Sequence, residues 1–135
     1  MQSGERFDAF ALLRERVDEA ALGAALTLFT DREDLGFIWL GFADDRPVGV
    51  CVATTAIALG AGGLVLRIGD IAIVEDVDPI GVARQMLAAL VKHVRAFGIA
   101  RFEAQAPEGD VRARTLYAAC GFQPDRAETV YILAP

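Results

Sequence analysis

Residues 64–83 read LVLRIGDIAIVEDVDPIGVA, and this stretch decides the fold. Its first part, 64–74, is rich in Val, Leu and Ile, which favour a β-strand. An acidic loop follows, and Asp78 is a suitable cap for a helix. Pro79 suits the first helical turn, where its missing N–H would have no partner anyway. The stretch therefore predicts a strand, a short loop and a helix that starts beside the end of the strand.

The segments after this stretch predict a parallel strand pair. Apolar residues at helical spacing continue the helix to about residue 97, and residues 100–106 then alternate as in a strand. A strand–helix–strand unit with a right-handed crossover makes 64–74 and 100–106 parallel neighbours. Asp110 is expected to cap a short helix over 111–119.

The N-terminal half predicts helices followed by a hairpin. A helical pattern over 8–30 is expected to be divided by Gly23 into two helices. Strands are expected over 37–42 and 48–59, antiparallel to each other and to the strand that follows. A last strand is expected over 129–133.

Together these elements predict an α/β (α+β) domain. Its sheet is expected to be mixed and mostly antiparallel, with a central parallel strand pair flanked by helices. All 135 residues fit one domain, with residues 1–7 as a flexible tail.

Composition narrows the classes of function. The chain is 54% hydrophobic, which argues against disorder, and its net charge of −6 disfavours nucleic acid as a partner. Charges and glycines interrupt every long apolar run, so no membrane span is expected. Residues 1–7 are polar, unlike a secretory leader, and we expect a cytoplasmic protein. So much apolar surface on a short chain favours a homodimer.

The chain offers few side chains for metal or redox chemistry. Cys51 and Cys120 are expected to be small hydrophobic residues without a disulfide, and no metal site is expected because His93 is the one histidine. We expect His93 to be an exposed helical residue, and Trp39 to lie in the core or in a subunit contact.

The predicted helix start after residue 78 is a candidate anion site. A helix N-terminus presents unpaired N–H groups and the positive end of the helix dipole. A phosphate-bearing ligand is therefore expected near residues 78–84, although many α/β proteins share this arrangement.

Two short motifs make the prediction more specific. Residues 78–83, DPIGVA, resemble the pyrophosphate loop of the GNAT acyltransferases, and residues 113–122, ARTLYAACGF, resemble the Leu-Tyr and Gly-Phe motif of the same family. Residues 69–74 are similar to the family's fourth strand. The resemblance covers residues 35–135 and implies an acetyl-CoA-dependent N-acetyltransferase, with acetyl-CoA as cosubstrate and a small-molecule or peptide amine as acceptor.

The resemblance also implies roles for particular residues. Backbone groups of Ile71 and Ile73 would bind the pantetheine arm. Tyr117 would be the general acid for the departing thiolate, and Asp70 is the preferred candidate for the base, ahead of Glu75 and Asp76. The N–H groups that would hold the pyrophosphate belong to Ile80, Gly81, Val82, Ala83 and Arg84.

Several positions depart from the family pattern. Asp78 places an anion where the family has a basic or amide residue, and Pro79 removes one N–H donor. Gly60 and Ala61 replace the acidic and aromatic residues of similar hairpins. These changes motivate a second hypothesis, a GNAT-fold binding or dimerisation module with weakened or lost catalysis. A third is a phosphate-binding α/β domain outside this family, with a different strand order.

Overall fold

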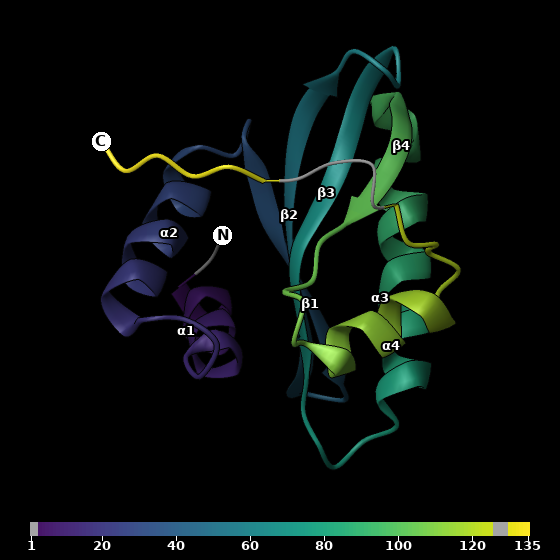
Figure 1. Ribbon diagram of the computed structural model, residues 1–135. Coiled ribbons are helices and arrows are strands. Elements are labelled where there is room, and N and C mark those ends of the chain that lie inside the picture. Colours follow the sequence, from purple (N-terminus) through teal and green to yellow (C-terminus); the bar gives the residue numbers. More distant parts are fainter. Residues whose placement is uncertain (1–2, 126–129) are drawn as a thin grey trace.

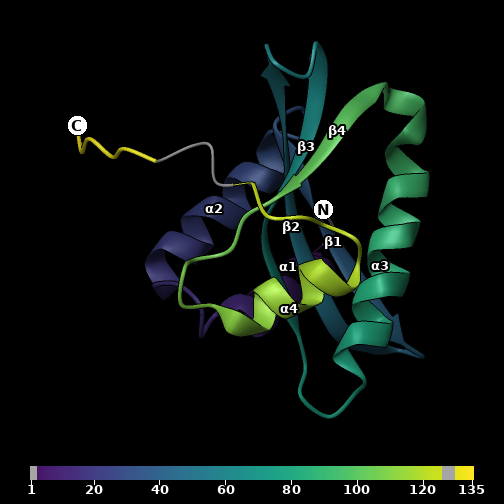
Figure 2. The same cartoon turned by 45° about the vertical axis from the view of Figure 1, so that its right-hand side comes forward.

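The computed structural model describes residues 3–125 and 130–135, which form three layers (Figure 1). Helices α1 (Ser3–Leu13) and α2 (Glu19–Asp31) cover one face of a sheet. Helices α3 (Pro79–Val94) and α4 (Val111–Ala119) cover the other face, and a 3₁₀ turn, η1 (Arg95–Phe97), extends α3 (Figure 2). No helix of the described residues is long and apolar enough to cross a membrane.

The sheet has the order β1-β2-β3-β4 in the described residues. Its strands are β1 (Gly36–Ala43), β2 (Arg46–Ala58), β3 (Gly63–Ile73) and β4 (Ile99–Ala104). Strands β1, β2 and β3 are antiparallel neighbours, and β4 pairs parallel with β3. The predicted mixed sheet and its parallel pair are therefore confirmed. The pair lies at one side of the described sheet rather than at its centre, because β4 has no strand beyond it there.

Two clusters of buried side chains hold the layers together. The larger lies between the sheet and helices α3 and α4 and includes the fully buried Leu66, Ile68 and Leu90. The smaller joins α1 and α2 to the sheet around Leu26 and Val50. Both faces of the central strands are thus covered, which explains why β2 and β3 are almost continuously apolar.

The N-terminal helices differ from the prediction in two ways. Gly23 lies inside α2 instead of dividing two helices, and the break falls at residues 14–18, where Asp18 caps α2 by accepting a hydrogen bond from the Ala21 N–H (3.1 Å). Residues 3–7 belong to α1 rather than to a flexible tail. Arg6 explains both results, because its guanidinium donates to the Gly23 carbonyl (3.1 Å) and to Thr27 (3.0 Å), which ties α1 to α2.

The expected last strand is not present in residues 130–133, and Thr129 lies outside the described residues. The segment 130–135 leaves the sheet on the same side as α2 (Figure 1). A strand needs a hydrogen-bonding neighbour, and these residues have none among those described. Their side chains are exposed instead: Val130 81%, Tyr131 90%, Ile132 90% and Leu133 93%.

Replacing Gly36 by Ala is expected to destabilise the fold by about 2 kcal/mol. A Cβ at this buried position would collide with the carbonyl oxygen of Ala53 on the neighbouring strand, which belongs to backbone and cannot move aside cheaply. Gly23→Ala is the matched control, because outside its own helix no described residue has an atom within 4 Å of the new Cβ. This variant should stabilise α2 by about 0.5–1 kcal/mol. Urea unfolding measures both; equal stability of the two variants would contradict the prediction.

Candidate active site

Strands β3 and β4 pair over only part of their length. The ladder runs from Leu64 to Ile68, and the N–H of Gln105 then donates to the Ile68 carbonyl (2.8 Å). Beyond that point the chain leaves toward α4, and no described residue pairs with residues 69–73 on this side. The parallel strands therefore separate and leave a gap bordered by the second half of β3.

A β-bulge at Gly69 marks the place where the strands separate. Val52 of β2 pairs with Asp70 and Ala53 pairs with Ile68, so Gly69 is an extra residue. A bulge bends its strand and increases the local twist, which turns the end of β3 away from β4.

The bulge also decides which backbone groups face the gap. The N–H of Val74 donates to the carbonyl of Val48 on β2 (2.9 Å). Because backbone groups alternate in direction along a strand, those of Ile71 and Ile73 point away from β2 and into the gap. Their backbone donors and acceptors thus border the gap without a partner among the described residues; that they bind a pantetheine arm stays a prediction.

The start of α3 has fewer free donors than predicted. Pro79 has no N–H, and the Val82 N–H already donates to the Asp78 carbonyl (3.1 Å). Ala83 and Arg84 lie one and two positions further into the helix, where N–H groups are used by the helical ladder. Of the five predicted donors, only the N–H groups of Ile80 and Gly81 have no partner among the described residues.

The carboxylate of Asp78 lies directly over this helix start. Asp78 makes no capping hydrogen bond, yet its Oδ2 would be 2.6 Å from a Cβ at Gly81. The carboxylate therefore lies beside Gly81, whose N–H is one of the two free donors. The positive end of the helix dipole is partly compensated by this internal anion.

Tyr117 comes from α4 and is buried in the same cluster as Ile71 and Ile73. Its ring lies 5.7 Å from that of Phe122, centroid to centroid. The hydroxyl is buried and has no hydrogen-bond partner in the part of the chain that the structure describes. Burial raises the pKa of this phenol, and the nearby Cys51 and Asp70 raise it further. The side chain is a protonated donor at neutral pH without an acceptor.

Arg16 bridges the two sides of the gap. It follows α1, and its guanidinium lies 2.6 Å from Asp110 Oδ2 and 3.4 Å from Asp70 Oδ1. Asp110 also accepts the N–H of Ala113 (3.0 Å) as the predicted cap of α4, and this hydrogen bond, with Arg16, lowers the pKa of Asp110. One cation is thus shared by two carboxylates, from β3 and from the start of α4.

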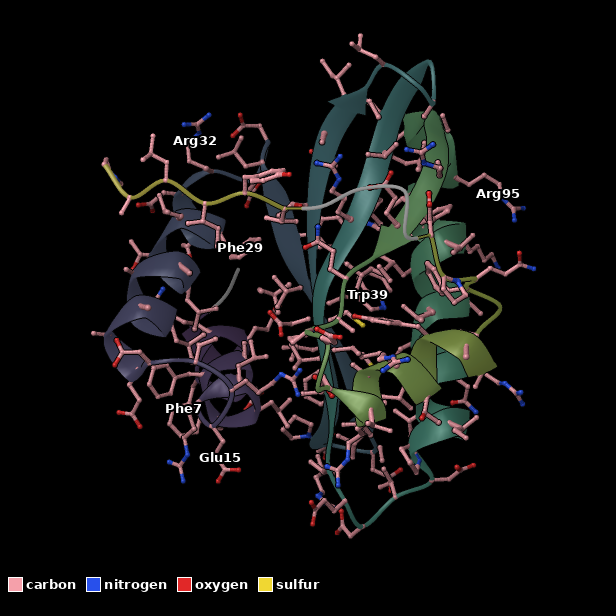
Figure 3. The ribbon with its side chains drawn as sticks, viewed as in Figure 1. Phe7, Glu15, Phe29, Arg32, Trp39 and Arg95 are labelled. Atoms are coloured by element: carbon pink, nitrogen blue, oxygen red, sulfur yellow. The ribbon has the colours of Figure 1, made fainter. Side chains whose placement is uncertain are left out.

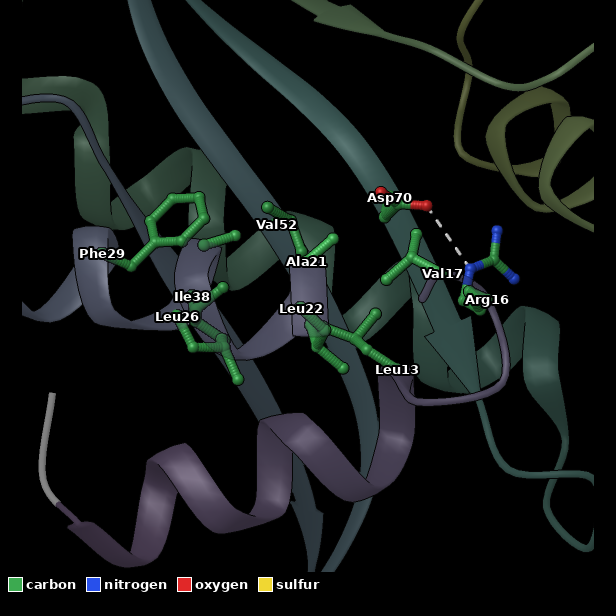
Figure 4. Close-up of a pocket in the computed structure, with 11 residues that line it drawn as sticks. Leu13, Arg16, Val17, Ala21, Leu22, Leu26, Phe29, Ile38, Val52 and Asp70 are labelled. Atoms are coloured by element: carbon green, nitrogen blue, oxygen red, sulfur yellow. Dashed lines mark hydrogen bonds and ion pairs between the residues drawn. The ribbon is translucent and has the colours of Figure 1, made fainter. Parts of the chain in front are cut away.

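A pocket of about 210 Å³ lies on the α1 and α2 side of the sheet (Figure 4). Phe29 and Ile38 line one end, and Asp70 with Arg16 lines the other. The pocket thus runs under α2 and ends at Asp70, next to the bulge where β3 leaves β4.

The other candidate side chains of the sequence lie elsewhere. Glu75 and Asp76 are surface residues paired with Arg112 (3.2 Å) and Arg46 (2.6 Å). Both cysteines are free; Cys51 is fully buried, and burial raises its pKa to about 12.

An aromatic contact joins β1 to α3 away from the gap. Trp39 lies between the sheet and α3 (Figure 3), and its indole N–H donates to the Met86 carbonyl (3.0 Å). Of the two expected roles, the structure shows packing within the chain. His93 is exposed, as expected, but its ring lies tilted against the Trp39 ring, with the two centroids 5.2 Å apart.

Arg16 is the site residue that sequence reasoning missed. It lies in a run of charged residues between two helices, and no motif distinguishes it from its neighbours. Its partners are 54 and 94 residues away in the chain, so only folding brings them together.

A mixed sheet whose parallel strands part beside a helix start defines the class of acyl-CoA N-acyltransferase folds. The chain belongs to the acetyltransferase (GNAT) family, whose model matches residues 7–122. No curated protein matches the chain in sequence.

Solved structures share this fold at low sequence identity. Aminoglycoside N-acetyltransferase AAC(6')-Iy in complex with CoA is 16% identical, with a TM-score of 0.81 over 98% of this chain and 91% of that chain. Aminoglycoside 6'-N-acetyltransferase AAC(6')-IG from Acinetobacter haemolyticus is 17% identical, with a TM-score of 0.80 over 100% and 95%. Ribosomal-protein-alanine N-acetyltransferase from Brucella melitensis biovar Abortus 2308 is 17% identical, with a TM-score of 0.78 over 98% and 96%.

Proposed function

We propose that this protein is an acetyl-CoA-dependent N-acetyltransferase that moves an acetyl group to a primary amine by direct attack. The observation that carries the proposal is that the second half of β3 has an open edge close to a buried side chain that offers a free hydrogen-bond donor. The backbone groups of Ile71 and Ile73 face the gap, and the side chain of Tyr117, whose hydroxyl is buried, packs in the same cluster as the side chains of these two residues. CoA bound to a structure of the same fold supports acetyl-CoA as the cosubstrate.

In this proposal the pantetheine arm lies along β3 as an added strand, hydrogen-bonded to Ile71 and Ile73. The pyrophosphate rests on the N–H groups of Ile80 and Gly81 at the start of α3. The thioester is then held near Tyr117, and catalysis depends mainly on positioning.

The reaction needs one proton removed and one proton delivered. The amine loses a proton, for which Asp70 is the candidate acceptor, and its nitrogen attacks the thioester carbonyl carbon. A backbone N–H of the 71–73 segment stabilises the tetrahedral oxyanion. The C–N bond forms, the C–S bond breaks, and the hydroxyl of Tyr117 donates its proton to the departing sulfur. The second proton of the acylated nitrogen then restores the phenol of Tyr117.

Calorimetry with acetyl-CoA, followed by thiol release with a panel of amines, tests the proposal. Saturable binding and amine-dependent release of CoA are the expected results. Absence of binding at millimolar acetyl-CoA would contradict them and favour the second candidate, a GNAT-fold module without catalysis. The carboxylate of Asp78 above Gly81 is the observation in favour of that module.

Replacing Asp78 by Asn is expected to raise acetyl-CoA affinity about fivefold, because a negative charge is removed from the path of the pyrophosphate. Asp31→Asn is the matched control: it makes the same change in net charge at the exposed end of α2 and should leave affinity unchanged. Calorimetry at low ionic strength measures both. Equal affinities in all three proteins would show that Asp78 does not face the cofactor.

We also propose that two copies associate through the C-terminal segment. Residues 130–133 are apolar and exposed, and β4 has no outer neighbour among the described residues. A cavity of about 490 Å³ beside β4, lined in part by Leu87, Val91 and Phe102, offers apolar surface to such a segment. Light scattering should find a dimer for the native chain and a monomer for Ile132→Lys. A native chain that is also monomeric would contradict the proposal.

A further inference from the structure

The pocket under α2 has one charged end and a long apolar remainder. Among the described residues that line it, Asp70 is the only acid and Arg16 the only base, and all others are apolar. Leu13, Leu22 and Leu26 form its floor toward α1 and the sheet, and Phe29 lies at the end farthest from Asp70 (Figure 4). A ligand that fills the pocket must therefore be apolar over most of its length.

The charged end is the end that meets the gap. Asp70 is the residue directly after the bulge, and its partner Arg16 also holds Asp110 at the start of α4. The two carboxylates and one guanidinium leave a net charge of −1 at this end. A single ammonium group is attracted there, next to the place proposed for the thioester.

The size of the pocket sets the size of the ligand. An engineered protein cavity of about 150 Å³ holds benzene. This pocket, at about 210 Å³, has room for a ring of that size and a short arm. A polycation has no set of carboxylates to bind here, since the described lining supplies only Asp70.

From these observations we infer that the acceptor is a small primary amine with an apolar body, such as an aryl-alkyl amine. Its ammonium group lies at Asp70 and its apolar part lies under α2 toward Phe29. The inference rests on the proposed function and names the substrate class of the same site.

Phenethylamine is the probe that matches this description. In a thiol-release assay, its kcat/KM is expected to exceed that of ethanolamine, which lacks the apolar body, at least tenfold. It should exceed that of sisomicin, a polycationic amine, by a similar factor. Preference for sisomicin, or for a short peptide with a free N-terminus, would overturn the inference.

Ala21→Phe fills the pocket from the exposed side of α2, where the substitution does not disturb the core. It is expected to raise the KM for phenethylamine at least tenfold and leave the KM for acetyl-CoA unchanged. Ala24→Phe is the matched control, an exposed alanine of the same helix that does not line the pocket. The same KM for phenethylamine in both variants would overturn the inference.

Methyl NMR without acetyl-CoA separates this inference from the proposed function. Phenethylamine should shift the methyl signals of Val17 and Val52, both in the pocket lining, in the native chain and in Ala24→Phe but not in Ala21→Phe. These shifts without acetyl transfer to any amine would support the ligand class and overturn the transferase proposal. Acetyl transfer to other amines without these shifts would overturn the inference alone.

Discussion

Tyr117→Phe is expected to lower kcat more than tenfold and to leave acetyl-CoA affinity within twofold. The variant loses only the buried hydroxyl, which has no partner among the described residues and which we propose donates to the departing sulfur. General acid catalysis contributes about 10²–10⁴-fold to enzymatic rates, so its loss should dominate turnover. Single-turnover kinetics with calorimetry of acetyl-CoA binding separates the two quantities.

Stability distinguishes this role from a structural one. A buried hydroxyl without a partner costs about 1–3 kcal/mol, so Phe at position 117 should leave the melting temperature unchanged or raise it. Tyr131→Phe is the matched control, since Tyr131 is the other tyrosine and is 90% exposed; it should change neither turnover nor stability. Native turnover in Tyr117→Phe would remove the phenol from the mechanism.

Deleting Gly69 is expected to preserve the fold and to weaken acetyl-CoA binding at least tenfold. Without this residue, Ile68 and Asp70 keep their partners Ala53 and Val52, and the ladder between β2 and β3 becomes regular. The bend that separates β3 from β4 is lost, and the backbone groups of Ile71 and Ile73 close against the chain after β4. Each hydrogen bond lost to the cofactor costs about 0.5–1.5 kcal/mol.

Gly69→Ala is the control that keeps the extra residue. Apart from its chain neighbours, no described residue has an atom within 4 Å of a Cβ at this position, so the variant should bind acetyl-CoA like the native chain. Calorimetry measures affinity, and circular dichroism with thermal melting shows whether the deletion variant is folded. Native affinity in a folded deletion variant would exclude the bulge as the feature that opens the cofactor site.

The spacing of apolar residues in β3 shows how far the sequence could be used. Leu66 and Ile68 are two positions apart, as are Ile71 and Ile73, which is the spacing of side chains on one face of a strand. From Ile68 to Ile71, however, the step is three positions. All four face α3 in the structure because Gly69 is bulged. The break in alternation was a local signal for the bulge, and it is the kind of irregularity expected at a functional site.

The two wrong predictions of secondary structure have a common cause, because each depends on tertiary contacts that a local pattern does not contain. Glycine disfavours helices, so the sequence predicts a helix break at Gly23, but contacts from Arg6 to Gly23 and Thr27 support the helix through that point. The last strand is expected from β-forming residues alone, yet residues 130–133 have no strand beside them in the part of the chain that the structure describes. The intrinsic preference of a residue for helix or strand is overruled where the fold supplies a supporting contact, as at Gly23, or supplies no neighbouring strand among the described residues, as at 130–133.

The sequence by itself determined the order of the helices and strands from α1 to α4, the parallel pair of β3 and β4, and the family resemblance of residues 78–83 and 113–122, because these follow from local periodicity and chain connectivity. Only the tertiary structure decided that Arg16 joins Asp70 to Asp110, that the Asp78 carboxylate lies beside Gly81, and that the hydroxyl of Tyr117 has no partner among the described residues. These contacts join residues from different elements or depend on side-chain direction, and no local pattern encodes them.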